Sequence, residues 1–356
     1  MAGGYGGGDL NLEKLLVGKS YWSLAAVTVS IALVKTGVHS RGTGVLWDLS
    51  EFPNPVGGYP ETTSYGLRTI AWLLRIDSRP QLLILVAVIN LLAVGLIALA
   101  VMRSPLLSGN RQRKLAMMLL LSGPMIWTLS QNVGRVDILT ISGSVLLASM
   151  TFGHFGAALG IGLLLGGNPE QSLVVGVSLL ILSCVDSLRH LRQRAAWLLL
   201  LATFLTVGLT AWTQHLDQFS RTAALPTALF ESLNNFTNWL PITLYSILGP
   251  AVLWLMVPLL GCQKRTLILV LGGLAVPLLA TAVTLDLSRV GVTTSSAALT
   301  ALAIWSAPQL LSWFESHDLP ALSMSFAVTG LMPAVQVLYF STVVAPWSSL
   351  NLFGLG

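Results

Sequence analysis

The sequence predicts an all-α protein: a polytopic bundle of transmembrane helices with a large first non-cytoplasmic loop that carries an interfacial helix. Two observations predict this class. Hydrophobic residues make up 54% of the chain and charged residues only 9%, whereas a soluble domain carries about 25% charged residues. Apolar stretches of about 20 residues recur along the chain, and each is long enough to cross a bilayer as a helix.

The apolar stretches predict about eleven membrane-spanning segments. Residues 138–167 are the weakest part, because two helices of about 14 residues would each be only about 21 Å long. We expect a pair of short helices there, or a hairpin that dips part way, although one long tilted helix is the alternative. The approximate bounds of the segments are 20–38, 81–102, 115–132, 138–152, 154–167, 171–185, 195–213, 239–260, 266–285, 290–312 and 320–345.

Basic residues predict the orientation of the bundle. Eleven segments with a cytoplasmic N-terminus place every basic cluster on the cytoplasmic side, as the positive-inside rule requires. The start lacks the features of a secretory signal, so we expect residues 1–19 to form a flexible cytoplasmic tail and residues 20–356 to form one transmembrane domain, in a bacterial inner membrane. The clusters are Arg103/Arg111/Arg113/Lys114, Arg189/Arg192/Arg194 and Lys264/Arg265.

Polar segments between the spans converge on the opposite, non-cytoplasmic side. Ionisable groups near membrane depth are costly and suggest function. Each set also has a structural interpretation, because the charged pairs could be ion pairs at helix ends and Asn168-Pro169-Glu170 matches a helix start. The residues are Arg41 and Arg68 in the first loop, then Arg135 and Asp137, Asn168 and Glu170, and Asp286 and Arg289.

The first loop, residues 39–80, is the most distinctive feature. It is far longer than a turn requires, and its carboxylates Asp48, Glu51 and Glu61 alternate with aromatic residues and prolines. The segment 62–74 has the pattern of an amphipathic helix lying in the membrane interface. A second long non-cytoplasmic loop is expected at 214–238.

This layout resembles the membrane-embedded glycosyltransferases of the C type, which use polyprenyl-phosphate-linked sugars. The resemblance rests on "VLWDLSEFPNP" after the first span and on "GRVD", "GNPEQ" and "LDLSRV" in later loops. It implies transfer of a sugar to an acceptor hydroxyl of a glycan, lipid or protein at the non-cytoplasmic face. Asp48 would be the general base and Glu51 its partner or a metal ligand. Oxygen ligands for a divalent cation, Mg or Mn, are plentiful, but no residue pattern specifies one.

The resemblance also implies roles for the remaining polar residues. Arg135 and Arg289 would clamp the lipid phosphate, because the planar guanidinium matches phosphate geometry. The other polar residues of these loops would hold the arginines or the sugar: Asp137, Glu170 and Asp286, with Asn168, Arg41 and Arg68 beside them.

Other functions remain alternatives. A multi-helix transporter or lipid flippase would suit the Pro- and Gly-interrupted helices, and a non-catalytic subunit of a membrane complex would suit the lack of a soluble domain. The net charge of +5 needs no nucleic acid, because the basic residues cluster at helix ends. Cys184 and Cys262 predict neither a disulfide nor a metal site, and no hydrolase, protease or nucleotide-binding motif is present.

Overall fold

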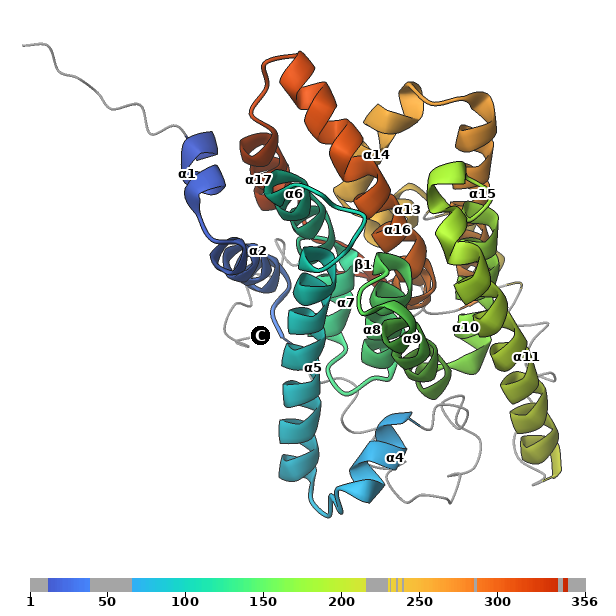
Figure 1. Cartoon of the computed structure of the whole chain (residues 1–356). Helices are drawn as coiled ribbons and strands as arrows, with labels where there is room; N and C mark the ends of the chain where they lie inside the picture. The colour runs from blue at the N-terminus through green and yellow to red at the C-terminus, as the bar shows by residue number, and fades with distance from the viewer. Residues whose placement is uncertain are drawn as a thin grey trace, which may run out of the picture.

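The computed structural model describes residues 12–38, 66–215, 230, 232–234, 236–238, 240–284, 287–338 and 342–344. Nearly all of this part of the chain is helical, which confirms the all-α prediction (Figure 1). The helices are α1 (Leu12–Gly18), α2 (Tyr21–Thr36), α4 (Gly66–Leu73), α5 (Arg79–Met102), α6 (Asn110–Leu121), α7 (Pro124–Gln131), α8 (Asp137–Ser149), α9 (Gly153–Gly167), α10 (Pro169–Leu182), the 3₁₀ helix η2 (Asp186–Leu191), α11 (Arg192–His215), α13 (Leu240–Leu248), α14 (Ala251–Leu260), α15 (Lys264–Ala282), α16 (Leu287–Ser316) and α17 (Ala321–Leu331).

The number of membrane-spanning helices is lower than predicted. Every predicted segment contains a helix, but among the described residues only α5, α15 and α16 are long and apolar enough to cross a membrane. The count rises to five if the bent pairs α1–α2 and α13–α14 each form one span. The prediction of about eleven spans is therefore wrong by this measure. Apolar composition indicates helices, but it does not report where a helix stops, and α8, α9 and α10 have only 13, 15 and 14 residues.

Proline and glycine divide two of the predicted segments. The segment 115–132 breaks between α6 and α7 at Gly123-Pro124, and 239–260 breaks between α13 and α14 at Gly249-Pro250 with a bend of 88°. Proline removes a backbone donor and clashes with the preceding turn. Gly249 has φ +58°, and a Cβ there would lie 2.5 Å from Pro124 Cδ. The two breaks therefore pack directly against each other, and only glycine fits at position 249.

The last predicted segment, 320–345, is also shorter in the structure. It forms α17 and then two short antiparallel strands, β1 (Gln336–Leu338) and β2 (Thr342–Val344), in which Val337 pairs with Val343. At the other end of the chain, α1 lies inside the stretch expected to be a tail and turns into α2 with a bend of 119°. Lys114 Nζ donates to the carbonyls of Leu16, Val17 and Lys19 at 3.1, 2.7 and 2.6 Å, and so satisfies the end of α1.

The expected pair of short helices in residues 138–167 is confirmed as α8 and α9. The chain reverses between them at Met150, Phe152 and Gly153, which have φ values of 62°, 61° and 58°. The helices pack closely because glycines face each other: a Cβ on Gly143 would lie 2.5 Å from the carbonyl oxygen of Gly160. Small residues that let helix backbones approach are typical of membrane helix interfaces.

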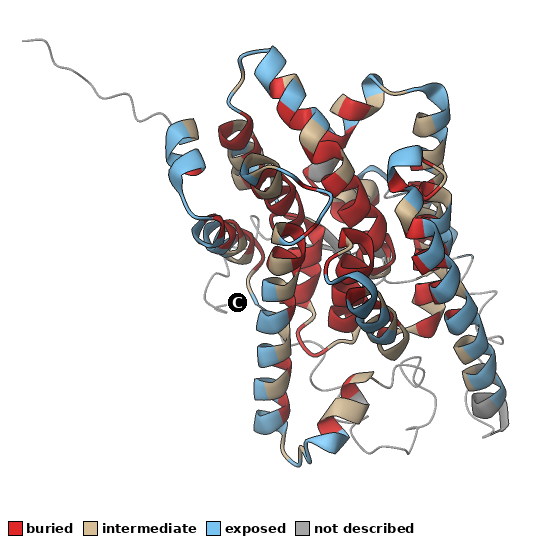
Figure 2. Cartoon of the chain, in the orientation of Figure 1, coloured by how far each residue is buried: buried red, intermediate tan, exposed pale blue. Residues whose placement is uncertain are grey.

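The outer helices of the bundle present apolar side chains to their surroundings. The most apolar part of α5 is only 28% buried, against 89% for the central helix α16. Figure 2 shows the same contrast, with exposed residues along α5 and mostly buried residues in the lower part of α16. Leu91 of α5, Phe204 of α11 and Leu260 of α14 are 74%, 82% and 84% exposed. Large exposed apolar surfaces are not stable in water, so this surface matches the hydrocarbon of a bilayer. The structure thus supports the prediction of a multi-pass membrane protein.

The central helix α16 contacts α6, α7, α8, α10, α13, α14, α15 and α17. Its buried hydroxyl groups bond to carbonyls within the helix, as Thr300 Oγ1 does to the carbonyl of Ser296 at 2.7 Å. Other hydroxyls join neighbouring helices: Ser178 of α10 donates to the carbonyl of Gly273 in α15 at 2.6 Å, and Tyr21 of α2 donates to that of Ala98 in α5 at 2.7 Å. Such bonds satisfy buried polar groups without water.

Candidate functional site

The elements that carry the described residues of the predicted site meet at one end of the bundle, which we call the α4 end. The N-termini of α8 and α16 meet there through Arg289 and Asp137, the end of α9 and the start of α10 pack on α8, and the C-termini of α2 and α7 are in contact. Helix α4 lies below the bundle in the view of Figure 1, against the end of α9. A helix is present within the predicted segment 62–74, namely α4, whereas its position in a membrane interface stays a prediction. Its first residue, Gly66, packs against the end of α9, since a Cβ there would lie 2.5 Å from the carbonyl oxygen of Gly166. Leu67 and Ala71 are buried, whereas Trp72 and Leu73 are 54% and 64% exposed.

The basic clusters lie at the opposite end, which we call the basic end. There α5 and α16 end and α6, η2, α11 and α15 begin (Figure 1). Hydrogen bonds connect these helix ends: Ser104 Oγ donates to the carbonyl of Ser149 at 2.8 Å, and Thr151 Oγ1 to that of Ala100 at 2.6 Å. Arg111 pairs with Glu13 at 3.2 Å and with Glu315 at 2.8 Å. The separation of basic and polar loops to two ends agrees with the predicted arrangement.

Two of the predicted residues form a buried ion pair at the α4 end. Arg289 Nε in the first turn of α16 lies 3.6 Å from Asp137 Oδ2 at the start of α8. The two side chains are 16% and 3% exposed. Burial of both charges is costly unless they are paired, and an ion pair between two helix N-termini fixes the positions of α8 and α16 relative to each other.

The turn before α8 also positions Arg135. Asn132 caps α7, because its backbone N–H and its side-chain Nδ2 both donate to the carbonyl of Thr128, at 3.0 and 3.1 Å. The chain then turns at Gly134, where φ is +95°, and Arg135 N–H donates to the carbonyl of Asn132 at 3.0 Å. This tight turn holds Arg135, which is half-buried, two residues before Asp137.

The predicted helix start at Asn168 is confirmed. Asn168 Oδ1 accepts a hydrogen bond from the backbone N–H of Gln171 at 3.0 Å, Pro169 is the first residue of α10, and Glu170 lies in its first turn. The preceding residue, Gly167, packs against Thr140 of α8, since a Cβ at 167 would lie 2.6 Å from Thr140 Oγ1. The starts of α8 and α10 are therefore neighbours. The negative charge of Glu170 interacts favourably with the positive N-terminal end of the α10 dipole.

A polar layer from α2 and α7 adds residues that sequence reasoning did not select. Thr36 Oγ1 and Ser130 Oγ lie 2.8 Å apart, and Gln131 Nε2 donates to the carbonyl of Thr36. Gln131 is 2% exposed, and its buried Oε1 has no hydrogen-bond partner among the described residues. The sequence contains a sign of this layer, because the apolar helices α2 and α7 both end in polar residues. Only the fold shows that these two ends meet.

The structure does not describe the side chains of the remaining predicted site residues. Asp48, Glu51, Arg41 and Asp286 lie outside the described residues, and Arg68 is located only as a backbone position in α4. The two predicted catalytic carboxylates therefore remain predictions. Among the residues that the structure describes, no group of three or more His, Cys, Asp or Glu side chains could hold a metal ion.

The described part of the site has an arrangement suited to an anionic ligand. Three helix N-termini direct backbone N–H groups and partial positive charge to one region. Arg289, paired with Asp137, lies between two of them, and Arg135 lies in the turn before α8. Comparisons with known proteins do not identify it further: no family model, no curated protein and no solved structure matches this chain.

Proposed function

We propose that the protein is an integral-membrane glycosyltransferase that moves a sugar from a polyprenyl-phosphate donor to an acceptor hydroxyl at the α4 end. The observation that carries this proposal is the Arg289–Asp137 pair between the N-termini of α16 and α8. It places an arginine and two helix dipoles at the border of an apolar bundle, where the phosphate of a lipid-linked donor would lie. The resemblance in the loop sequences supports the same activity.

In this proposal Asp137 orients Arg289 for phosphate binding. A guanidinium has five N–H donors in a rigid fork, so a carboxylate near Nε sets the direction of the Nη groups. Arg135 is the second cation. As the glycosidic bond to phosphate breaks, negative charge grows on the departing phosphate, and two preorganised guanidinium groups stabilise that charge.

In this proposal the first loop supplies the carboxylate that takes the proton of the acceptor hydroxyl. The acceptor oxygen forms a bond to the anomeric carbon and loses its proton to a carboxylate, for which we propose Asp48, with Glu51 as its partner. The bond between the anomeric carbon and the phosphate oxygen breaks, and polyprenyl phosphate leaves. No step of this proposal requires a metal ion, and among the described residues no cluster of acidic, His or Cys side chains could hold one.

The proposed location follows from the two ends of the bundle. The positive-inside rule assigns the basic end, which holds Arg103, Arg113 and Arg192, to the cytoplasm. The α4 end and the first loop then face the non-cytoplasmic side of a bacterial inner membrane, with the N-terminus inside. A polyprenyl chain would partition into the hydrocarbon beside the exposed apolar faces of α5 and α11.

Sugar transfer by the purified full chain in nanodiscs tests the proposal. Wild type, Asp48→Asn and Arg289→Lys are compared with a panel of radiolabelled polyprenyl-phosphate sugars, and Arg192→Lys at the basic end is the matched control. We expect transfer to be lost in Asp48→Asn and to fall by about 10²-fold or more in Arg289→Lys, with the control unchanged. Normal transfer in Arg289→Lys would remove that residue from the phosphate site, and no transfer by wild type from any donor would refute the activity.

A further inference from the structure

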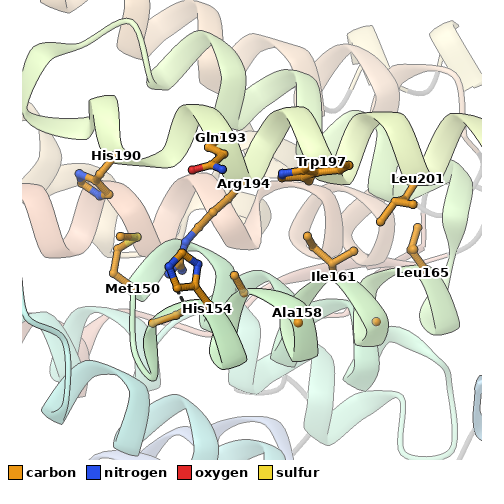
Figure 3. Close-up of a pocket in the computed structure, with 13 residues that line it drawn as sticks. Met150, His154, Ala158, Ile161, Leu165, His190, Gln193, Arg194, Trp197 and Leu201 are labelled. Atoms are coloured by element: carbon orange, nitrogen blue, oxygen red, sulfur yellow. Dashed lines mark hydrogen bonds between the residues drawn. The ribbon is translucent and has the colours of Figure 1, made fainter.

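A groove lies on the side of the bundle, between α9 and α11, away from the α4 end site. Its volume is about 620 Å³, within the usual range for small-molecule sites. Figure 3 shows that apolar side chains, Ile161, Leu165 and Leu201, line one part of it. His154, His190, Gln193 and Arg194 line the other part, at the basic end. The groove is therefore amphipathic along its length.

The dimensions of the groove match one leaflet of a bilayer. Both helices begin at the basic end, so His154 lies beside Arg194 and Leu165 beside Leu201 (Figure 3). Leu165 follows His154 by eleven positions in α9, a rise of about 16 Å, and half the hydrocarbon thickness of a bilayer is about 15 Å. The surrounding surface is apolar, since Phe155 and Leu200 are 70% and 59% exposed. A ligand in this groove would be in contact with lipid along its open side.

The polar part of the groove is cationic and built into the fold. Arg194 Nη1 donates to the carbonyl of Leu147 at 2.9 Å and Nη2 to that of Gly153 at 2.8 Å, so the guanidinium joins the end of α8 to the start of α9. Arg194 is 9% exposed, and in the described part of the chain no carboxylate forms an ion pair with it. None of the described residues that line the groove is acidic. The positive charge of Arg194 is therefore not neutralised by a carboxylate among the described residues, although its two Nη atoms donate to backbone carbonyls.

His190 adds a neutral hydrogen-bonding group to this part of the groove. Burial, and then the charge of Arg194, lower the pKa of His190 below its ordinary value. Its Nε2 atom is buried and has no hydrogen-bond partner among the described residues. A buried polar atom without a partner costs free energy unless a ligand or water satisfies it.

We propose that this groove binds one anionic phospholipid of the leaflet at the basic end, with an acyl chain between α9 and α11 and the headgroup phosphate beside His154, Gln193 and Arg194. Charge complementarity selects the anionic headgroup, and basic pockets between membrane helices on the cytoplasmic side are known to favour such lipids. The proposed headgroup position is separate from the proposed donor phosphate position, because His154, Gln193 and Arg194 lie at the basic end, whereas Arg289 and Asp137 lie at the α4 end. It stands whether or not the protein transfers sugars.

A glycine in the groove makes a selective test feasible. Gly162 lines the groove, and a Cβ there would meet no atom within 4 Å. Gly162→Leu therefore adds a side chain to the groove lining at a position where a Cβ has open space. Gly208 on the outer surface of α11 is also free of contacts within 4 Å but does not line the groove. Gly208→Leu is thus a matched control with the same change in side chain.

The measurement is lipid retention by the purified full chain, by native mass spectrometry, with phosphatidylglycerol and phosphatidylcholine of identical acyl chains and with a polyprenyl phosphate. We expect wild type and Gly208→Leu to retain phosphatidylglycerol at least about tenfold more tightly than phosphatidylcholine, and Gly162→Leu to lose that retention. His154→Glu should weaken the retention of phosphatidylglycerol by about tenfold. His317→Glu, at an exposed position on the basic end, should leave this retention unchanged.

Three results would overturn the proposal. Equal retention of the two phospholipids by wild type would show that no headgroup site exists. Full retention of phosphatidylglycerol in Gly162→Leu would show that the lipid binds elsewhere. Preferential retention of polyprenyl phosphate, lost in Gly162→Leu, would assign the groove to the donor lipid instead of a phospholipid.

Discussion

The close packing of α8 on α9 makes a quantitative prediction about two glycines of this hairpin. A Cβ added at Gly143 would lie 2.5 Å from the carbonyl oxygen of Gly160 and 2.9 Å from the backbone nitrogen of Leu164. Both are backbone atoms, so rotation of a side chain cannot relieve the overlap. A Cβ added at Gly162, on the same pair of helices, would meet no atom within 4 Å.

The same substitution should therefore have opposite effects at the two positions. Alanine is favoured over glycine in a helix by about 0.8–1 kcal/mol, and this term applies to both. Overpacking at Gly143 costs about 1–3 kcal/mol because the helices must separate. Since the propensity term cancels, Gly143→Ala should be less stable than Gly162→Ala by about 1–3 kcal/mol, and Gly162→Ala should be slightly more stable than wild type.

Unfolding of the two variants in mixed micelles, followed by circular dichroism as sodium dodecyl sulfate is added, measures this difference. Gly160→Ala is a useful third variant, because its Cβ would lie 2.9 Å from the carbonyl oxygen of Gly143, a milder overlap. If Gly143→Ala and Gly162→Ala unfold within about 0.5 kcal/mol of each other, the helices do not approach as described. The placement of Asp137 and Asn168, which depends on this hairpin, would then also be incorrect.

Three further predictions concern the basic end and the orientation of the chain. Lys114→Met should lower the free energy of unfolding by about 1.5–3 kcal/mol, because three carbonyls at the end of α1 lose a charged donor; an unchanged value would show that water replaces it. Because burial and the charge of Arg194 keep the pKa of His190 low in the folded state, the contribution of His190 to stability should be complete above about pH 6.5 and should decrease as the pH falls toward the lowered value. His190→Gln should remove this pH dependence, and an identical pH profile in that variant would refute it. Cysteines at Asp77 and Ser187, both exposed and at opposite ends, should react with an impermeant reagent from opposite sides of the membrane; reaction from one side would reject the transmembrane orientation.

Local features of the sequence were sufficient to predict much of the structure. Apolar stretches located a helix in every predicted segment, and Asn168-Pro169 marked the start of α10 because a cap and an N1 proline act within one turn. The amphipathic pattern after residue 62 marked α4. Two short helices in residues 138–167 were also predicted, because a pair keeps the basic clusters on one side, and the structure has α8 and α9 there. With 13 and 15 residues, these helices are nonetheless shorter than the candidate membrane spans.

Tertiary structure decided how far each helix extends and which helix ends meet. Gly123 and Gly249 could be recognised as interruptions, but the length that remained on each side depended on how the two breaks pack together. The contact of Arg289 with Asp137 joins residues far apart in the chain, and no local periodicity encodes such a pair. The same is true of Lys114, whose buried charge is acceptable only because the carbonyls at the end of α1 surround it. Composition and periodicity determine whether a segment is an apolar helix. Close packing between segments determines which polar groups share a site.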